Sequence, residues 1–336
     1  MEQVYSRSYR RCVLIIFLLS FCCFIGYTNC KVVGGFVLPH GGVALDPRNF
    51  NTRNQTERDE AKTLHEACLK VGRDVKDLKP DIIFLSTPHG LSDYRNFLLY
   101  SNAMGSADPY TGADTCCVYR SYGDADDCLV LPCRYNLSVE FETQIASMVT
   151  KLFGYSRNVS LLTAFGPEGN ENSISLRWGE VIPLLFVGNM SISKIVILSQ
   201  PTRRYTDSVH MIPELIQLGN DLFRLLDESP QRIAVIISSD LAHTHKADGP
   251  YGYSNASQPF DDAVGKWAST LDFNFLVKAG TLVDRALSCG YTGLVMLHGM
   301  LSHLDVSSWT STVYANLHPS YYGMMAASFH RNDILQ

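Results

Sequence analysis

The chain has 336 residues, of which 46% are hydrophobic and 18% are charged, and its formal net charge is −5. This composition is typical of a globular protein and excludes a disordered or fibrous chain. The acidic balance, with no long basic run beyond the N-terminus, argues against nucleic acid or an anionic membrane as a partner.

The first 30 residues predict a secretory signal peptide. Arg7, Arg10 and Arg11 precede an apolar stretch over residues 12–27, and small residues follow it. The stretch is short for a membrane span, which needs about 20 apolar residues. We therefore predict a secreted protein or one in the lumen of the secretory pathway, with no stable membrane partner once the signal is cleaved. An uncleaved membrane anchor over residues 12–27 is the alternative.

The rest of the chain, residues 31–336, predicts one domain in which strands alternate with helices. Apolar runs predict strands at 32–38, 81–86, 181–187, 194–199, 232–238 and 323–329. Helices are expected at 57–71, 138–153, 207–227, 260–270, 273–288 and 292–304. The alternation favours a single α/β domain, in which helices cover both faces of a mostly parallel central sheet.

A Gly/Asp/Tyr-rich segment at about 91–135 is expected to be a long irregular loop. It holds four crowded cysteines: Cys116, Cys117, Cys128 and Cys133. In an oxidising compartment, two disulfides are the favoured interpretation, and a structural zinc site is the alternative.

N-glycosylation sequons agree with secretion. Five of them begin at Asn54, Asn136, Asn158, Asn189 and Asn255. One such motif is weak evidence because it is common by chance, whereas five beside a signal peptide are stronger.

Three histidines each follow a predicted buried strand: His40 after 32–38, His89 after 81–86 and His243 after 232–238. Because ligands bind at the carboxyl ends of the strands in open α/β sheets, these side chains are expected to converge. Histidine is the commonest metal ligand and titrates near neutral pH, so a metal site is the leading hypothesis.

Asp240 lies near His243 and is interpreted in two ways. It either orients a histidine of the site, as carboxylates do beside metal ligands and general bases, or caps a helix. His245 belongs to the site or to its rim. A Ser-His-Asp hydrolase is disfavoured because the chain has no Gly-X-Ser-X-Gly motif.

These motifs resemble the class III extradiol ring-cleavage dioxygenases of the LigB type. The resemblance rests on His40, His89, the segment 239–243, the segment Asp248-Gly-Pro-Tyr-Gly-Tyr253 with Pro259-Phe-Asp261 after it, and Ser288-Cys-Gly-Tyr291. It covers essentially the whole chain after residue 31. It implies a single α/β domain, ferrous iron as the cofactor, and a catechol or aminophenol as substrate. By position, His40 and His89 match the iron ligands, and His243 matches the acid/base histidine.

The chain departs from this family at the carboxylate ligand. Many relatives have Glu directly before the Cys-Gly pair, whereas this chain has Ser288. Asp284, one helical turn upstream, is one candidate replacement. Cys289 is the other, because the related Memo proteins resemble this chain in combining histidines with a cysteine. A thiolate ligand favours zinc or copper over ferrous iron. The competing interpretation of Cys289 is a buried apolar residue or half of a disulfide.

Three functions therefore stand as hypotheses. The first is an Fe(II)-dependent extradiol dioxygenase of a small aromatic substrate. Tyr251, Tyr253 and Phe260 are candidates for stacking on its ring, and the alternative is that they are ordinary core residues. The second is a secreted Memo-like metal-binding or redox protein that lacks dioxygenase activity. The third is a pseudoenzyme that keeps the fold for partner binding.

Overall fold

The computed structural model describes residues 31–50, 52–107, 137–165, 173–188 and 193–334. The predicted signal peptide or anchor and the four clustered cysteines lie outside the described residues, as do Asn136 and Asn189. Within the described ranges, no helix combines the length and apolar character that crossing a bilayer requires.

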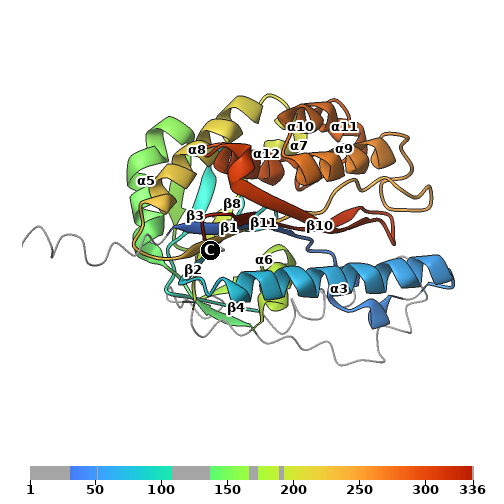
Figure 1. Ribbon diagram of the computed structural model, residues 1–336, viewed down its shortest axis with the longest axis horizontal. Coiled ribbons are helices and arrows are strands. Elements are labelled where there is room, and N and C mark those ends of the chain that lie inside the picture. The colour runs from blue at the N-terminus through green and yellow to red at the C-terminus, as the bar shows by residue number, and fades with distance from the viewer. Residues whose placement is uncertain (1–30, 51, 108–136, 166–172, 189–192, 335–336) are drawn as a thin grey trace, which may run out of the picture.

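A mixed eight-stranded sheet forms the centre of the molecule (Figure 1). Its order is β10-β11-β1-β9-β2-β8-β3-β6. The four central strands, β1, β9, β2 and β8, run parallel to one another. β11 pairs antiparallel with β1, and β3 pairs antiparallel with β8. The strands are β1 (Val32–Leu38), β2 (Ile82–Thr87), β3 (Phe97–Tyr100), β6 (Val159–Leu162), β8 (Lys194–Ser199), β9 (Ile233–Ser238), β10 (Trp309–Leu317) and β11 (Met324–Arg331).

Helices cover both faces of this sheet, as the sequence predicts. One face carries α5 (Thr143–Arg157), α7 (Arg204–Asp207), α8 (Ile212–Asp227), α9 (Ser257–Thr270), α10 (Phe273–Gly280), α11 (Val283–Ala286) and α12 (Tyr291–Leu301). The other carries α2 (Gly42–Leu45), α3 (Gln55–Asp77) and α6 (Trp178–Val187). A second sheet, of order β5-β4-β7, consists of β5 (Ser138–Glu140), β4 (Met104–Ala107) and β7 (Ser173–Leu176). Short 3₁₀ turns lie at Pro47–Asn49 and Val306–Ser308.

The central strands are apolar on both sides because each contributes to two hydrophobic cores. In β2, Ile82 and Phe84 pack into the core beneath α8 and α12, whereas Ile83 and Leu85 pack into the core with α3 and α6. Side chains alternate along a strand, so a strand buried on both faces needs a continuous apolar run. This explains why the sequence shows the inner strands clearly.

Several predicted elements are wrong. Residues 181–187 form part of helix α6, although the apolar run predicted a strand, and Glu180 caps the start of this helix through the backbone N–H of Arg177 at 2.7 Å. A short apolar run has the same pattern in a buried strand and a buried helix. The segment 91–135 includes strands β3 and β4, and residues 138–140 form β5 before α5 begins. The predicted helix 273–288 is two helices, α10 and α11.

Two glycines let α8 and α12 pack with their backbones in contact. A Cβ added to Gly219 would lie 2.1 Å from the carbonyl oxygen of Met296, and one added to Gly299 would lie 2.5 Å from that of Ile216. Backbone atoms cannot rotate away as a flexible side chain can. The close crossing of these two helices therefore depends on both glycines.

We expect Gly219→Ala to lower the free energy of unfolding by about 1–3 kcal/mol, the usual cost of overpacking. Urea unfolding measures the effect. Gly154→Ala in α5 is the matched control, because its added Cβ would meet its nearest atom, the carbonyl oxygen of Val159, at 3.2 Å. Equal losses in the two variants would contradict the close crossing.

A second prediction concerns Glu180, whose buried carboxyl accepts a hydrogen bond from the hydroxyl of Tyr100. Burial raises the pKa of Glu180 to about 7. The folded state therefore keeps a proton that the unfolded chain releases at lower pH, so stability falls as the pH rises through this window. Between pH 5 and 7.5, we expect the wild type to lose about 2–3 kcal/mol more than Glu180→Gln, by urea unfolding. Parallel pH profiles would contradict this assignment.

Candidate metal centre

Three neighbouring parallel strands bring the predicted site residues to one edge of the sheet. β9 lies between β1 and β2, and all three run in the same direction. His40 follows β1, His89 follows β2, and the segment from Ser239 to His243 follows β9. Their carboxyl ends therefore open onto a common space, as the strand order of an α/β sheet requires.

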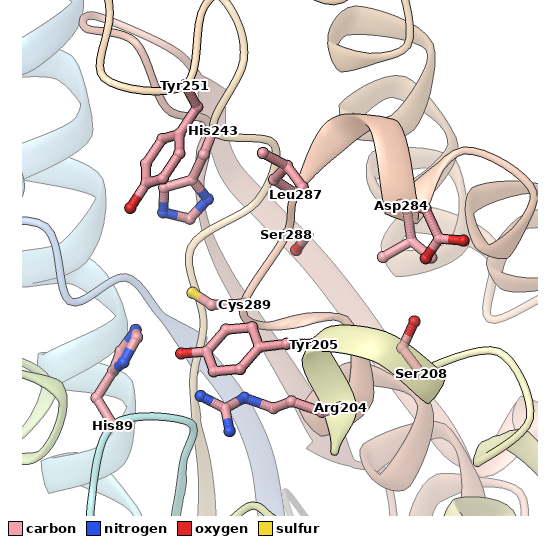
Figure 2. Close-up of a pocket in the computed structure, with 11 residues that line it drawn as sticks. His89, Arg204, Tyr205, Ser208, His243, Tyr251, Asp284, Leu287, Ser288 and Cys289 are labelled. Atoms are coloured by element: carbon pink, nitrogen blue, oxygen red, sulfur yellow. The ribbon is translucent and has the colours of Figure 1, made fainter. Parts of the chain in front are cut away.

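Cys289 reaches this space from the turn before α12 (Figure 2). The carbonyl oxygen of Asp240 holds the turn, because it accepts hydrogen bonds from the Ser288 hydroxyl and the Gly290 N–H, both at 3.1 Å. A Cβ on Gly290 would lie 1.9 Å from the Ser239 hydroxyl oxygen, so only glycine fits the turn. Cys289 is a free, buried thiol, so among the described residues it is not half of a disulfide.

The ligand atoms of His40, His89 and Cys289 all lie within 4.8 Å of one another. The two imidazole rings meet edge to face, with centroids 4.8 Å apart. The Sγ atom of Cys289 lies 3.4 Å from Nε2 of His40. These residues come from three distant parts of the chain, and their spacing could accommodate a single metal ion.

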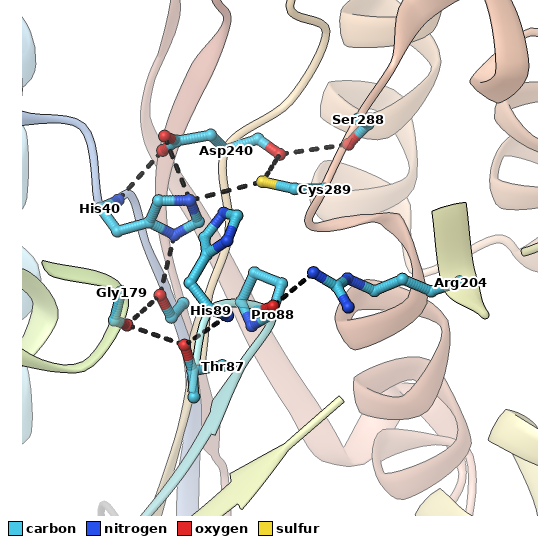
Figure 3. Close-up of polar contacts among 10 residues, drawn as sticks. His40, Thr87, Pro88, His89, Gly179, Arg204, Asp240, Ser288 and Cys289 are labelled. Carbon is cyan, nitrogen blue, oxygen red and sulfur yellow. Dashed lines mark hydrogen bonds and ion pairs between the residues drawn. The ribbon is translucent and has the colours of Figure 1, made fainter. Parts of the chain in front are cut away.

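A chain of hydrogen bonds fixes the tautomer of His40 (Figure 3). The Ser238 hydroxyl donates to the carbonyl oxygen of Gly179 at 2.5 Å, because a carbonyl can only accept. The Ser238 oxygen then accepts the Nδ1–H of His40 at 2.8 Å. Burial lowers the pKa of His40 well below its usual value, so the ring is neutral. A neutral ring protonated at Nδ1 presents its Nε2 lone pair to the site.

Two further groups face that lone pair. Oδ2 of Asp240 lies 3.3 Å from Nε2 of His40, and the Cys289 sulfur lies on the same side. Burial raises the pKa of Asp240 to about 7 and raises that of the Cys289 thiol as well, because both anions are poorly solvated. Once Asp240 and Cys289 lose their protons, the carboxylate, the thiolate and Nε2 of His40 are all acceptors that lie close together. A metal cation is the partner that this donor set fits.

Asp240 also organises the backbone of the site. Its Oδ1 accepts the N–H of His40 at 3.0 Å. No helix begins at Asp240, so the prediction that it caps a helix is wrong, and the prediction that it orients a histidine matches its position. Asp284, the other candidate carboxylate, is exposed on α11 and is not part of the group around the metal position.

The other two histidines at the strand ends are also held neutral. Burial and, to a smaller extent, the nearby charge of Arg204 lower the pKa of His89 to about 3. Burial lowers the pKa of His243 to about 4. Nδ1 of His243 is buried and has no hydrogen-bond partner among the described residues. Both rings therefore offer lone pairs at neutral pH.

Two hollows adjoin the candidate metal ligands, and both are lined by His89, His243 and Tyr251. The aromatic compartment has a volume of about 360 Å³ and is walled by Trp178, Tyr321 and Tyr322 beside His40. The arginine compartment has a volume of about 180 Å³ and is walled by Arg204, Ser208 and Ser288 beside Cys289. Since a cavity of roughly 150 Å³ can hold benzene, either compartment is large enough for one ring.

The three aromatic candidates lie in different surroundings, and Phe260 fits the alternative that it is a core residue. Tyr251 lines both compartments, but Tyr253 lines neither and is 67% exposed. Phe260 is completely buried in the core and lines neither compartment. The sequence missed Trp178 and Tyr322, because neither lies in a recognisable motif, although Tyr322 stacks on His243 with ring centroids 5.7 Å apart.

His245 lies away from the metal position. Its Nε2 is 2.8 Å from Oδ2 of Asp261, and its ring stacks on His318 at a centroid distance of 4.0 Å. Asp261 also accepts the N–H of Ala242 at 3.0 Å. The pair therefore supports the backbone of the segment that carries His243.

The fold and the site together define an α/β protein with a candidate metal centre at the carboxyl edge of its parallel strands. No family model matches the chain. Protein CA_C1420 of Clostridium acetobutylicum is 21% identical over 235 residues, which are 68% of this chain and 43% of that protein. The chain thus spans less than half the length of this relative.

A solved structure, that of the uncharacterized protein JW3007 from Escherichia coli K12, has a similar fold. It superposes with a TM-score of 0.52 and 16% identity, covering 88% of this chain and 99% of the other. The likeness supports a single α/β domain with a large, mostly parallel sheet.

We expect Ser238→Ala to weaken Zn²⁺ binding by about 10–100-fold, because Nδ1 of His40 loses the partner that fixes its tautomer. Competition against a chromophoric chelator measures the affinity. Ser239→Ala is the matched control, since the neighbouring Ser239 hydroxyl is buried without a hydrogen-bond partner among the described residues. If both variants bind Zn²⁺ equally well, the hydrogen-bond chain does not govern the site.

Proposed function

We propose that this protein is a metal-dependent oxidoreductase of the extradiol-dioxygenase type. His40, His89 and Cys289 would hold the metal ion, and a small catecholic or aminophenolic substrate would lie in the adjoining compartments. The observation that carries the proposal is the convergence of three ligand atoms within 4.8 Å beside a hollow walled by aromatic rings. The assignment of ring opening rests on the family resemblance of the sequence.

In this proposal, ferrous iron, when bound, supplies the site at which a catechol is chelated and O₂ is activated. The chain's own residues do the rest. Trp178 and Tyr322 wall the space in which a planar ring would be held. His243 faces both compartments with a neutral imidazole, so it can accept a proton from a substrate hydroxyl and return it later.

One observation favours a second function, that of a Memo-like metal-binding or redox protein without dioxygenase activity. The position that holds Glu in many extradiol enzymes is Ser288, whose hydroxyl donates to the carbonyl oxygen of Asp240. The ligand group therefore contains a sulfur atom and two imidazoles. This set suits zinc or copper better than ferrous iron.

Elemental analysis followed by turnover distinguishes the two functions. The purified chain is analysed for iron, zinc and copper, then made metal-free, loaded with Fe(II) without oxygen, and exposed to air with a panel of catechols and aminophenols. The dioxygenase proposal predicts a yellow ring-opened product. It also predicts that His243→Ala lowers kcat by about 10²–10⁴-fold while the iron content stays unchanged.

The outcomes separate cleanly. Absence of a ring-opened product from every substrate, together with retained zinc or copper that is lost in Cys289→Ser, would contradict the dioxygenase and support the Memo-like function. Metal content that is unchanged in both His40→Ala and Cys289→Ser would contradict both functions.

A further inference from the structure

Arg204 is a buried cation in the wall of the candidate site. It is the first residue of α7, is 5% exposed, and lines the arginine compartment together with His89 and Cys289 (Figure 2). The ring of Tyr205 covers its guanidinium, with 4.0 Å between the guanidinium carbon and the ring centroid. No sequence motif marks this residue. Like the histidines of the site, Arg204 follows the end of a buried strand, β8.

The hydrogen bonds of Arg204 go to backbone carbonyls. Nη1 donates to Pro201 at 3.1 Å and more weakly to Gln200 at 3.4 Å, and Nη2 donates to Pro88, the residue before His89. These contacts fix the guanidinium and brace the His89 loop (Figure 3). Carbonyl oxygens satisfy N–H groups but carry no negative charge. The positive charge of Arg204 is therefore held in place without being neutralised.

Within the described ranges, no carboxylate forms an ion pair with Arg204. The neighbouring Arg203, by contrast, forms an ion pair with Glu214. Asp284 borders the same compartment but is exposed and makes no ion pair with Arg204. Nε of Arg204 also has no hydrogen-bond partner among the described residues. A buried charge without a counter-charge is costly, and an anionic ligand bound beside it would lower that cost.

The candidate metal ligands border both the arginine compartment and the aromatic compartment. Cys289 borders the arginine compartment, His40 borders the aromatic compartment, and His89 borders both. A ligand at the metal position can therefore contact aromatic rings on one side and the guanidinium on the other. Guanidinium groups match carboxylates in geometry and charge, forming short, charge-assisted hydrogen bonds.

We propose that Arg204 selects an aromatic ligand that carries a carboxylate, and that this carboxylate provides the missing counter-charge. The inference deepens the proposed function, because it places the ring of the same substrate in the aromatic compartment. Charge selection by Arg204 does not need the metal, however, so it can be tested on its own.

The test compares two probes on the metal-free full chain by isothermal titration calorimetry. 3,4-Dihydroxyphenylacetate carries a carboxylate, and 3,4-dihydroxyphenylacetamide replaces it with a neutral amide of similar size. We expect the wild type to bind the acid at least about tenfold more tightly than the amide, as a charge-assisted contact implies. Arg204→Met should lose this preference, whereas Arg204→Lys should keep part of it.

Arg203→Met is the matched control, because it removes the adjacent arginine and its ion pair with Glu214 but leaves the compartment unchanged. It should retain the preference for the acid. Equal affinities of the wild type for the two probes would overturn the proposal, even if Arg204→Met fails to fold. So would a preference that persists in Arg204→Met.

These results are independent of turnover. A preference for the acid in the absence of ring opening would leave Arg204 as a ligand-selecting residue and count only against the dioxygenase. Ring opening with equal affinities for the acid and the amide would support the dioxygenase and contradict the role of Arg204 in ligand selection.

Discussion

The candidate site depends on one arrangement: the unprotonated Nε2 of His40 faces a carboxyl oxygen of Asp240 and the sulfur of Cys289. Nε2 of His40 carries a lone pair because the Ser238 oxygen accepts a hydrogen bond from the Nδ1–H, while the Ser238 hydroxyl donates to the Gly179 carbonyl. Asp240 and Cys289 approach the same nitrogen at 3.3 and 3.4 Å. Burial raises the pKa of both the carboxyl and the thiol, so without a cation their protonated forms are favoured. A bound metal ion would remove this conflict.

The fold makes the arrangement rigid by joining both layers of the molecule at the site. Gly179, in the first turn of α6, accepts hydrogen bonds from Ser238 on β9 and from Thr87 on β2. A Cβ on Gly179 would lie 2.8 Å from Cβ of His89, so glycine allows α6 to approach the second candidate ligand. From the opposite layer, Arg204 braces the carbonyl of Pro88. The His89 loop is therefore held from both sides of the sheet.

The sequence predicts well which residues lie at the carboxyl ends of the parallel strands, because each strand and the residues after it are neighbours in the chain. β1, β2 and β9 are mostly apolar runs, and each is followed by one of the three histidines. Parallel strands then imply convergence of the histidines at their ends. The predicted group of His40, His89 and Cys289 does lie together in the structure. The metal, the reaction and the secretion remain predictions.

Features that depend on contacts between distant segments could not be predicted from the sequence. The run 181–187 is apolar on all sides, so periodicity did not distinguish a buried helix from a strand. Trp178 and Tyr322 wall the aromatic compartment from segments without a motif. Arg204 could be recognised as unusual only once the structure showed that its partners are carbonyl oxygens rather than carboxylates.

The most direct test of the account is the absorption spectrum of the Co²⁺-substituted protein. Ligation by two imidazoles and one thiolate predicts one Co²⁺ per site and a thiolate-to-cobalt charge-transfer band in the near ultraviolet. The band should disappear in Cys289→Ser and persist in Cys68→Ser, since Cys68 is the other buried free cysteine of the described chain. A spectrum without the band, or a band unaffected by Cys289→Ser, would contradict the proposed centre.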